Sequence, residues 1–465
     1  MCGIAGIVGK SANIENAKWM SRVLAHRGPD QEGYFHEGRI ALGHRRLSII
    51  DLSEAGKQPF YNDDKSLVLV FNGEIYNYLE IRKELNKKYQ FRSKTDTEVL
   101  LYAYQEWGID CLSKFIGMFA FAIYDKKRDL IFCARDRIGK KPLFYYKDNE
   151  NFFFASEIKA LLSIGVPRIP NYKIIYDYLY YGYYDHTNET FFKDIFSLPQ
   201  GHYFLIKDNN FTIKKYWEVG DRLINIKFKR EKSLISKFKE LIIDSLSLRL
   251  RSDTPIGVTL SGGLDSSSLM AIIDQLFEKK DTIFTYSIFY KNPIFSEEMY
   301  INEMADFKEW TNYNIRISHE DIKNHMLDVL RSQDQPYAGV PTIAYAELMK
   351  KARKNGCIVL LEGQGMDEMV GGYKYYYGAY ILDLIFKGRL LAAYNELKAI
   401  KIKRINIPSF LIKAILNVYF HRAQDGTKPT YTKGIKVIFF RKFKRTKSIK
   451  IFFFCCILLH IFNKF

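Results

Sequence analysis

The sequence predicts two folds joined in one chain, an α+β sheet sandwich of the αββα type followed by an α/β doubly wound parallel sheet. The sandwich is predicted because short apolar runs alternate with turns from Phe115 to Glu157, a pattern typical of strands. The parallel sheet is predicted because strand-like runs beyond Glu231 are separated by segments of helix length. A chain of 465 residues has room for two or three domains with full cores.

The expected strands follow from these apolar runs. In the sandwich they lie at residues 67–71, 119–124, 130–134, 143–146 and 152–155. In the parallel sheet they lie at residues 255–260, 282–289, 313–318 and 357–361. Ligands on such a sheet bind at the carboxyl ends of its strands, so we expect a site where residues 261–267, 287–288 and 362–363 converge.

A glycine-rich turn follows the first of the parallel strands. Residues 260–268 read Leu-Ser-Gly-Gly-Leu-Asp-Ser-Ser-Ser and precede an expected helix that begins near residue 269. Paired glycines let the backbone approach a ligand, and the helix N-terminus then presents N–H groups, so the turn suits a phosphate. Asp265 fits such a loop if Mg²⁺ lies between its carboxylate and the phosphate oxygens. The turn is not a Walker A motif, since no Gly-Lys-Ser/Thr follows the glycines, and an ordinary Gly/Ser-rich turn is the alternative.

The N-terminus offers a nucleophile. The small second residue allows removal of Met1, which would leave Cys2 with a free α-amino group beside its thiol. An α-amino group titrates near neutral pH, so it can take the thiol proton and later protonate a leaving amine. The alternative is a small buried cysteine that opens the first strand.

Charge and cysteine content limit the function classes. The net charge is +18, but eleven Lys and Arg residues and one Asp lie between residues 421 and 465, so this segment alone carries +10. The body of the chain therefore has an ordinary balance, and we expect no nucleic-acid partner. The six cysteines lack the spacing of a zinc site, and no signal peptide is expected at the N-terminus. Reduced thiols and a cytoplasmic setting follow as expectations.

Several motifs follow Cys2 in an order known from a protein family. They are His26-Arg27-Gly28-Pro29-Asp30 and residues 43–51, 71–77 and 93–98. Their order resembles that of class II glutamine amidotransferases, and with the turn at 260–268 the arrangement resembles glutamine-hydrolysing asparagine synthetase from Met1 to about Tyr377. The resemblance implies an Ntn-type sandwich that releases ammonia from glutamine, and an ATP-pyrophosphatase domain built on the parallel sheet.

The resemblance assigns roles in the first domain, and the chemistry agrees with them. Cys2 is the expected nucleophile, Arg46 would hold the glutamine carboxylate, and Asp96 with Glu74 would hold the ammonium. Asn72 and the N–H of Gly73 would stabilise the oxyanion. The implied glutamine site is Arg46, Leu47, Ser48, Ile49, Ile50, Asn72, Gly73, Glu74 and Asp96. The alternative for Asn72-Gly73 is a type I′ hairpin turn after the strand at 67–71.

The second domain is expected to bind ATP and Mg²⁺. The implied ATP site is Leu260, Ser261, Gly262, Gly263, Leu264, Asp265, Ser266, Ser267, Ile288, Glu362 and Gly363. Asp265 and Asp367 are far apart in the chain, but the fold would bring both carboxylates to one face, where they would hold Mg²⁺. The alternative for Asp367 is a solvated acidic residue in a Gly-rich loop.

Four segments are expected. The glutaminase domain would span residues 1–170, a connector 171–225, an incomplete synthetase domain 226–423 and an atypical basic and aromatic tail 424–465. Residues 135–142 and 156–160 also resemble family segments and are interpreted as structural. The tail is open to three interpretations: a shifted reading frame, a membrane-associating segment too short for a stable span, or a basic patch for an acidic partner.

The predicted function is that of a glutamine-hydrolysing asparagine synthase, with aspartate as the expected acceptor acid and a homodimer implied by the resemblance. Gln364 departs from the glutamate usual in that family, and a neutral amide cannot act as a base. Two alternatives therefore stay open. One is an amidotransferase of a surface-sugar or peptide-modifying pathway that acts on another acid. The other is a glutaminase joined to a synthetase domain that does not ligate.

Overall fold

The structure is a computed structural model. It describes residues 1–208, 210–220, 231–276, 283–290, 296–308, 310–370, 372 and 374–402. The tail predicted at 424–465 and the expected end of the synthetase domain at 403–423 lie outside the described residues. The described chain divides into two compact units, of which the first holds residues 1–172 and 184–372 and the second the remainder.

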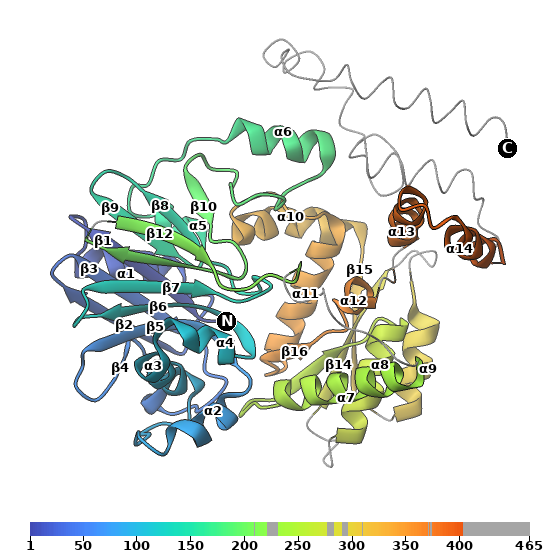
Figure 1. Ribbon diagram of the computed structural model, residues 1–465, viewed down its shortest axis with the longest axis horizontal. Helices are drawn as coiled ribbons and strands as arrows, with labels where there is room; N and C mark the ends of the chain where they lie inside the picture. The colour runs from blue at the N-terminus through green and yellow to red at the C-terminus, as the bar shows by residue number, and fades with distance from the viewer. Residues whose placement is uncertain are drawn as a thin grey trace, which may run out of the picture. The chain divides into compact units, whose positions relative to one another are not determined.

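Two six-stranded antiparallel sheets form the first part of the first unit (Figure 1). One sheet has the order β10-β8-β9-β1-β3-β2, and the other has the order β12-β11-β7-β6-β5-β4. Their bounds are β1 Gly3–Gly9, β2 Gln31–Glu37, β3 Ile40–Arg46, β4 Phe60–Tyr61, β5 Leu67–Ile75, β6 Gly117–Asp125, β7 Leu130–Arg135, β8 Phe144–Lys147, β9 Asn151–Ala155, β10 Ile195–Ser197, β11 His202–Lys207 and β12 Asn210–Lys215. The predicted sheet sandwich is confirmed.

Strand alternation explains why each sheet is covered on both faces. In β5, Val68 and Val70 point into the core between the two sheets, while Leu69 and Phe71 point to the opposite face. That opposite face is covered by α2 (Tyr78–Leu85), α3 (Asp96–Trp107) and α4 (Cys111–Lys114). The outer face of the other sheet is covered by α1 (Ile14–Val23) and α5 (Ile158–Leu162). The layer order is therefore αββα, as predicted.

A buried carboxylate fixes the start of α3. Glu98 is fully buried, and it accepts hydrogen bonds from the N–H of Arg92 (3.1 Å), the N–H of Ser93 (2.8 Å) and the Ser93 hydroxyl (2.6 Å). The Thr95 hydroxyl in turn accepts from the Glu98 N–H, which caps the helix. This network sets the direction in which the chain enters α3.

We expect Glu98→Ala to lower the free energy of unfolding by about 3 kcal/mol, because three donors would lose a charged acceptor in a buried place. Urea unfolding followed by circular dichroism would measure the change. Glu15→Ala is the matched control, since the Glu15 side chain is 66% exposed and pairs only with Lys18 among the described residues. Its effect should stay below about 0.5 kcal/mol. Equal losses in the two variants would contradict the role given to Glu98.

The segment predicted to be a connector, residues 171–225, contributes strands to the sandwich. Strand β10 pairs with β8, and β11 pairs with β7, so both sheets include residues beyond 170. The sheet continues through β12 to Lys215. The first part therefore reaches about 45 residues further than the boundary drawn from the sequence, because strand pairing over a long separation leaves no local mark in the chain.

A four-stranded parallel sheet forms the second part of the first unit. Its order is β15-β14-β13-β16, with bounds β13 Ile256–Thr259, β14 Ile283–Tyr290, β15 Asn312–Ile317 and β16 Val359–Leu361. One face packs against α7 (Glu231–Arg249), α8 (Leu264–Leu276) and α9 (Glu298–Lys308). The other face packs against α11 (Val340–Lys354). Helix α10 (His319–Gln333) precedes α11 in the chain, and α12 (Met366–Val370) follows β16. Helices on both faces confirm the predicted doubly wound sheet.

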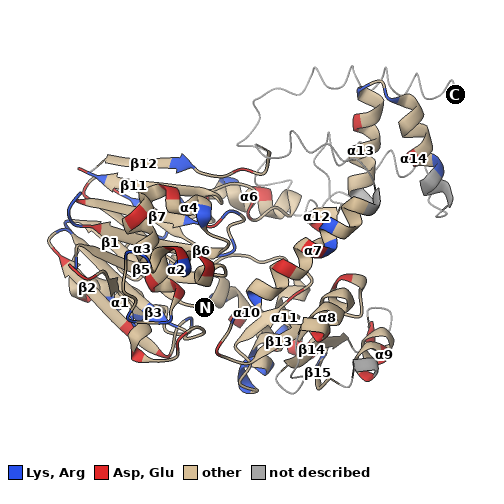
Figure 2. Ribbon diagram, turned by 60° about the horizontal axis from the view of Figure 1, so that its bottom comes forward, with Lys and Arg blue, Asp and Glu red and all other residues tan. Residues whose placement is uncertain are grey.

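The second unit contains α6 (Tyr172–Tyr181), α13 (Lys374–Phe386) and α14 (Leu390–Ile402). Ile381 and Leu384 of α13 pack against Ala393 of α14. Among the residues that the structure describes, no helix has the length and apolar character needed to cross a membrane. Lys and Arg are interspersed with Asp and Glu over the described residues (Figure 2), and some form exposed pairs such as Lys10–Glu150.

Candidate functional site

The N-terminal strand places Cys2 at the edge of a narrow cavity. Strand β1 pairs with β3, so Cys2 lies beside the residue that follows β3, Leu47. The Leu47 N–H points to the Cys2 sulfur at 3.4 Å, and the Arg27 side chain donates to the Cys2 carbonyl at 2.8 Å. These two contacts, from Arg27 and from the residue after β3, hold Cys2 in place, and Cys2 lines the cavity.

Asn72 lies on the wall of the same cavity. Its side chain is fully buried, and neither its oxygen nor its nitrogen has a hydrogen-bond partner among the described residues. A buried unpaired amide costs about 1–3 kcal/mol, so it needs a functional reason or a bound partner. The amide nitrogen is free to donate to a ligand bound in the cavity that Cys2 also lines. This orphaned group is the strongest sign of a binding site in the first part.

The hairpin alternative for Asn72-Gly73 is wrong. Strand β5 runs through both residues to Ile75, and Asn72 pairs with Ala120 and Gly73 with Phe119 of β6. A Cβ atom on Gly73 would lie 2.2 Å from the Met118 carbonyl oxygen. The glycine is therefore required by the close approach of β6, and this pairing holds Asn72 in the wall of the cavity that Cys2 also lines.

Two carboxylates lie deeper in the cavity wall. Burial raises the pKa of Asp96 to about 7, against a bond from the Ile75 N–H at 2.8 Å that favours the charged form. Burial also raises the pKa of Glu74, while the charge of Lys141 opposes that rise. A cationic ligand group would ionise both. The two carboxylates could therefore pair with an ammonium, and their role in binding the ammonium of glutamine stays a prediction.

Arg46 has a different surrounding from the one expected. Its guanidinium is 4% exposed and donates to the carbonyls of Ser53 (2.8 Å) and Ile50 (3.2 Å) and to the Gln31 side chain (2.9 Å). Arg46 therefore shapes the loop 47–53 that covers the cavity, and it also lines the cavity itself. Its role as the carboxylate clamp stays a prediction.

The structure brings nearly all of the predicted glutamine-site residues together. Arg46, Leu47, Ile49, Ile50, Asn72, Gly73, Glu74 and Asp96 line the cavity with Cys2. Ser48 does not line it, because its N–H is turned to the Asp30 carboxylate at 2.8 Å. Asp30 belongs to the motif at 26–30, so that motif holds the loop from outside.

Besides Met1, which also lines the cavity, sequence reasoning missed four residues of its wall, Gln58, Phe71, Thr97 and Lys141. Lys141 lies in a segment interpreted as structural, and it is 5% exposed. The Asp136 carboxylate accepts from its N–H at 2.9 Å, and Arg135 donates to its carbonyl at 2.8 Å. The only signal in the sequence was a pair of lysines directly before Pro142.

Lys141 also affects the N-terminal amine. Burial lowers the pKa of the Met1 α-amino group to about 5, and the nearby charges of Lys141 and Arg27 act in the same direction. The surroundings of the N-terminus therefore favour a neutral amine, which is the form that takes up a proton. Removal of Met1 would leave the α-amino group on Cys2, as expected from the sequence.

The glycine-rich turn in the second part has the geometry expected of an anion-binding loop. It connects β13 to α8, and Gly262 has a φ of 75°, a conformation that favours glycine. The Ser261 and Ser266 hydroxyls lie 3.0 Å apart, and Ser266 donates to the Gly263 carbonyl at 3.2 Å. These bonds close the loop on itself, so the N–H groups at the start of α8 are left to face a ligand.

The segment after β16 packs directly on this loop. A Cβ atom on Gly363 would lie 2.9 Å from the Ser266 nitrogen. Burial and the nearby negative charges of Asp367 and Glu368 raise the pKa of Asp265. The charge of Asp367 is therefore close enough to act on Asp265, while the role of the two residues as metal ligands stays a prediction.

The residues present fit a magnesium ion. Asp265 and Asp367 supply hard carboxylate oxygens, the donors that Mg²⁺ prefers, and their mutual repulsion would be relieved by a cation. Among the described residues no group of three or more His, Cys, Asp or Glu side chains forms a metal cluster. Two carboxylates with substrate phosphates are the usual protein share of a Mg²⁺ site.

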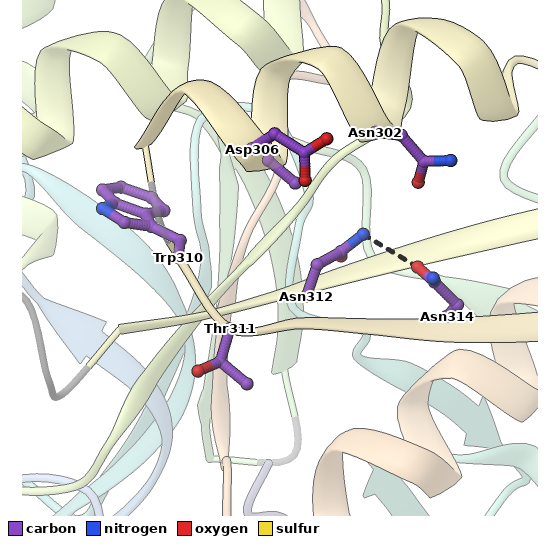
Figure 3. Close-up of a pocket in the computed structure, with 7 residues that line it drawn as sticks. Asn302, Asp306, Trp310, Thr311, Asn312 and Asn314 are labelled. Carbon is purple, nitrogen blue, oxygen red and sulfur yellow. Dashed lines mark hydrogen bonds between the residues drawn. The ribbon is translucent and has the colours of Figure 1, made fainter.

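A wider pocket of about 580 Å³ lies elsewhere, at the edge strand β15 (Figure 3). Asn302 and Asp306 of α9 face Asn312 and Asn314 of β15 across it, and Asn312 donates to Asn314 at 2.8 Å. None of the residues predicted for glutamine or nucleotide binding lines this pocket. It is separate from the two sites described above.

Comparisons with known proteins match both parts of the chain. The glutamine amidotransferase domain family matches residues 1–217, and the asparagine synthase family matches residues 237–424. A protein of Methanocaldococcus jannaschii named for glutamine-hydrolysing asparagine synthetase is 35% identical over 415 residues, which cover 83% of this chain and 78% of that protein. Glutamine-hydrolysing asparagine synthetase 1 of Bacillus subtilis is 34% identical over 81% of this chain.

The chain spans only 59% of that Bacillus relative. Among solved structures, the glutamine phosphoribosylpyrophosphate amidotransferase of Bacillus subtilis is 16% identical with a TM-score of 0.37, over 77% of this chain and 71% of that one. That structural score is too low to add weight. The sequence matches in both parts, with the cavity at Cys2 and the turn before α8, show that the chain belongs to the glutamine-hydrolysing asparagine synthetase family.

Proposed function

We propose that this chain releases ammonia from glutamine at Cys2 and uses it to amidate a carboxylic acid that ATP has activated as an acyl-adenylate. The unpaired buried amide of Asn72 beside Cys2 is the observation that carries the first half. It supplies a donor at the place where negative charge would develop, and the free protein gives it no other partner among the described residues.

The glutaminase half follows from residues of the cavity. The α-amino group of Cys2 takes the thiol proton, and the sulfur attacks the side-chain amide carbon of glutamine. Asn72 and the Gly73 N–H stabilise the oxyanion, and the amine returns the proton to the leaving nitrogen, which departs as ammonia. Water then cleaves the thioester to give glutamate. Asp96 and Glu74 hold the ammonium of the substrate.

The synthetase half uses the turn before α8. The acceptor carboxylate attacks the α-phosphorus of ATP, and pyrophosphate leaves from the loop that contains Ser261 and Ser266. Ammonia then attacks the acyl carbon, and AMP is released. We expect the N–H groups at the start of α8, together with Ser267, to bind the departing phosphates. Mg²⁺ held by Asp265 and Asp367 would neutralise charge on the pyrophosphate.

Aspartate is the acceptor that we propose. Relatives that are named asparagine synthetases support this acceptor. One of them is asparagine synthetase B of Escherichia coli, which is 31% identical over 82% of this chain. Gln364 favours a different acceptor acid, because a neutral amide stands where the family usually has the charged carboxylate of a glutamate. A Penicillium rubens protein named amidase chyE is 29% identical over 80% of this chain. Its name leaves room for amidation of another acid.

Cytoplasmic location and a homodimer are also proposals. The cysteines in the described residues, Cys2, Cys111, Cys133 and Cys357, are all free thiols, which suits a reducing compartment.

The test is pyrophosphate release from ATP by the full chain with Mg²⁺ and glutamine, with and without aspartate. Aspartate-dependent release, matched by formation of glutamate and asparagine, would support the proposal. Glutamate formation without pyrophosphate release for any acid tested would support the glutaminase-only alternative. Cys2→Ala should lose the glutamine-dependent reaction and keep the reaction supplied with ammonium chloride.

Glutamine binding should strengthen as pH rises through about 7. The raised pKa of Asp96 leaves its carboxyl largely protonated below that value, and the substrate ammonium needs the ionised form. We expect the Kd for glutamine to fall about tenfold between pH 6 and pH 8. Calorimetry on the Cys2→Ala variant isolates this change from titration of the thiol. The same measurement on Asp96→Asn in that background should show weak binding with no such dependence.

The stability of the protein without glutamine should change with pH in the opposite direction to glutamine binding. A carboxyl group whose pKa is raised on folding stabilises the folded state at low pH, and that stability is lost as pH rises from the usual carboxyl range towards 7. Bound glutamine would restore it. Denaturation at pH 5 and pH 8, with and without glutamine, would check this pattern in the Cys2→Ala variant.

A further inference from the structure

The segment Arg251–Asp253, which belongs to the synthetase part, contacts one wall of the glutamine cavity and the chain just beyond strand β5. The Asp253 N–H donates to the Ile49 carbonyl at 3.0 Å, and the Asp253 carboxylate accepts from the Asp51 N–H at 2.8 Å. These two bonds bracket Ile50. We call these two hydrogen bonds the Asp253 clamp. Because Ile49 and Ile50 line the cavity, the clamp fixes a part of the cavity wall.

Arg251 holds the chain just beyond β5. Its guanidinium donates to the Tyr76 carbonyl at 2.8 Å and forms two parallel bonds of 2.6 Å to the Glu80 carboxylate. The neighbouring Arg249 lies over the Tyr76 ring at 4.7 Å. Tyr76 follows the end of β5, the strand that carries Asn72, Gly73 and Glu74. Arg251 therefore secures the chain just beyond the oxyanion donors.

The loop that Asp253 holds is strained. Asp51 has a φ of 58°, a conformation that costs a non-glycine residue about 1 kcal/mol or more. Inside the loop, the Asp51 carboxylate accepts from the Lys94 N–H at 2.8 Å, and Arg46 binds the carbonyls of Ile50 and Ser53. The Asp51 N–H has its acceptor in Asp253, outside the glutaminase part. The loop conformation is thus completed by the other part of the chain.

From these contacts we propose that Arg251–Asp253 is a positioning element for the glutaminase site, in which Asp253 holds the loop 49–51 in the conformation that binds glutamine. The inference rests on the proposed function of that site. It assigns to the synthetase part a share in glutamine affinity. Asp253 touches no substrate atom and acts through the backbone of Ile49 and Asp51.

The test compares steady-state glutamine hydrolysis by the full chain and its variants. Asp253→Ala should raise the KM for glutamine about five- to tenfold and change kcat less than twofold, because the loop is displaced while Cys2 and Asn72 keep their places. Asp253→Asn should restore most of the loss, since its amide oxygen still accepts from the Asp51 N–H. The double variant Arg251→Ala, Asp253→Ala should raise KM further.

Asp328→Ala is the matched control, because Asp328 lies on α10 with its side chain 60% exposed and pairs only with Arg331 among the described residues. It should leave KM unchanged. Pyrophosphate release with ammonium chloride reports whether each variant is folded. A KM within twofold of the parent in both Asp253→Ala and the double variant would overturn the inference. Absence of glutamine hydrolysis in the parent chain would instead overturn the proposed function.

Discussion

Replacing Asn72 by alanine is expected to lower the kcat for glutamine hydrolysis by about 100- to 1,000-fold, equivalent to about 3 kcal/mol of lost transition-state stabilisation. The stability of the protein should not fall with it. Neither atom of the Asn72 amide has a partner in the described structure, so the substitution breaks no hydrogen bond of the free protein. Glutamate formation and thermal unfolding, measured on the same preparation, would separate the two effects.

Asn62→Ala is the matched control for this prediction. Asn62 is 2% exposed, and its amide donates to Gln105 at 3.0 Å and accepts from the Leu67 N–H at 2.9 Å. Its loss should lower the free energy of unfolding by about 1–3 kcal/mol and leave kcat within a few-fold of the parent. If Asn72→Ala were destabilising and catalytically silent, the oxyanion role would be wrong. The reaction supplied with ammonium chloride should proceed normally in both variants.

Replacing Gly363 by alanine is expected to reduce ATP-dependent pyrophosphate release by about 100-fold while glutamine hydrolysis continues. The added Cβ would lie 2.9 Å from the Ser266 nitrogen and 3.2 Å from the Asp265 Cβ, so the turn before α8 has to move. A displacement of about 1 Å in a site that positions reacting groups costs about 10²-fold in rate. The measurement is pyrophosphate release with ammonium chloride as nitrogen source.

Gly220→Ala provides the comparison, because a Cβ atom at Gly220 would meet nothing within 4 Å. Its pyrophosphate release should equal that of the parent chain. Equal activity of Gly363→Ala and the parent would show that the segment after β16 does not constrain the nucleotide loop. Unchanged glutamine hydrolysis in Gly363→Ala would show that the first part of the chain remains folded.

The elements that could be predicted are those with a local pattern. Strands β6, β7 and β9 were expected within two residues of their bounds, because alternating apolar runs between turns mark them. The Cys2 site was predictable for another reason, since its motifs resemble those of a known family. The cavity then confirmed that eight of the nine expected glutamine-site residues lie together with Cys2.

What escaped prediction depends on contacts between distant residues. Strand β5 continues through Asn72-Gly73 because β6 pairs beside it, a partner more than 40 residues away that no turn rule includes. Lys141 reaches the cavity because Asp136 and Arg135 fold its loop back. The clamp by Asp253 joins residues 202 positions apart in the chain. Each of these features is set by tertiary packing, which overrides local propensity.

The late strands of the sandwich determine where this chain can be divided. A glutaminase fragment ending at residue 170 would lack β10, β11 and β12, and the paired edges of β7 and β8 would be left open. Open edges with apolar faces pair with other chains, so such a fragment should aggregate during expression. A fragment carried to Trp217 keeps both sheets complete. A fragment of the first part should therefore end after β12, and because it would lack Asp253, we expect it to bind glutamine more weakly than the full chain.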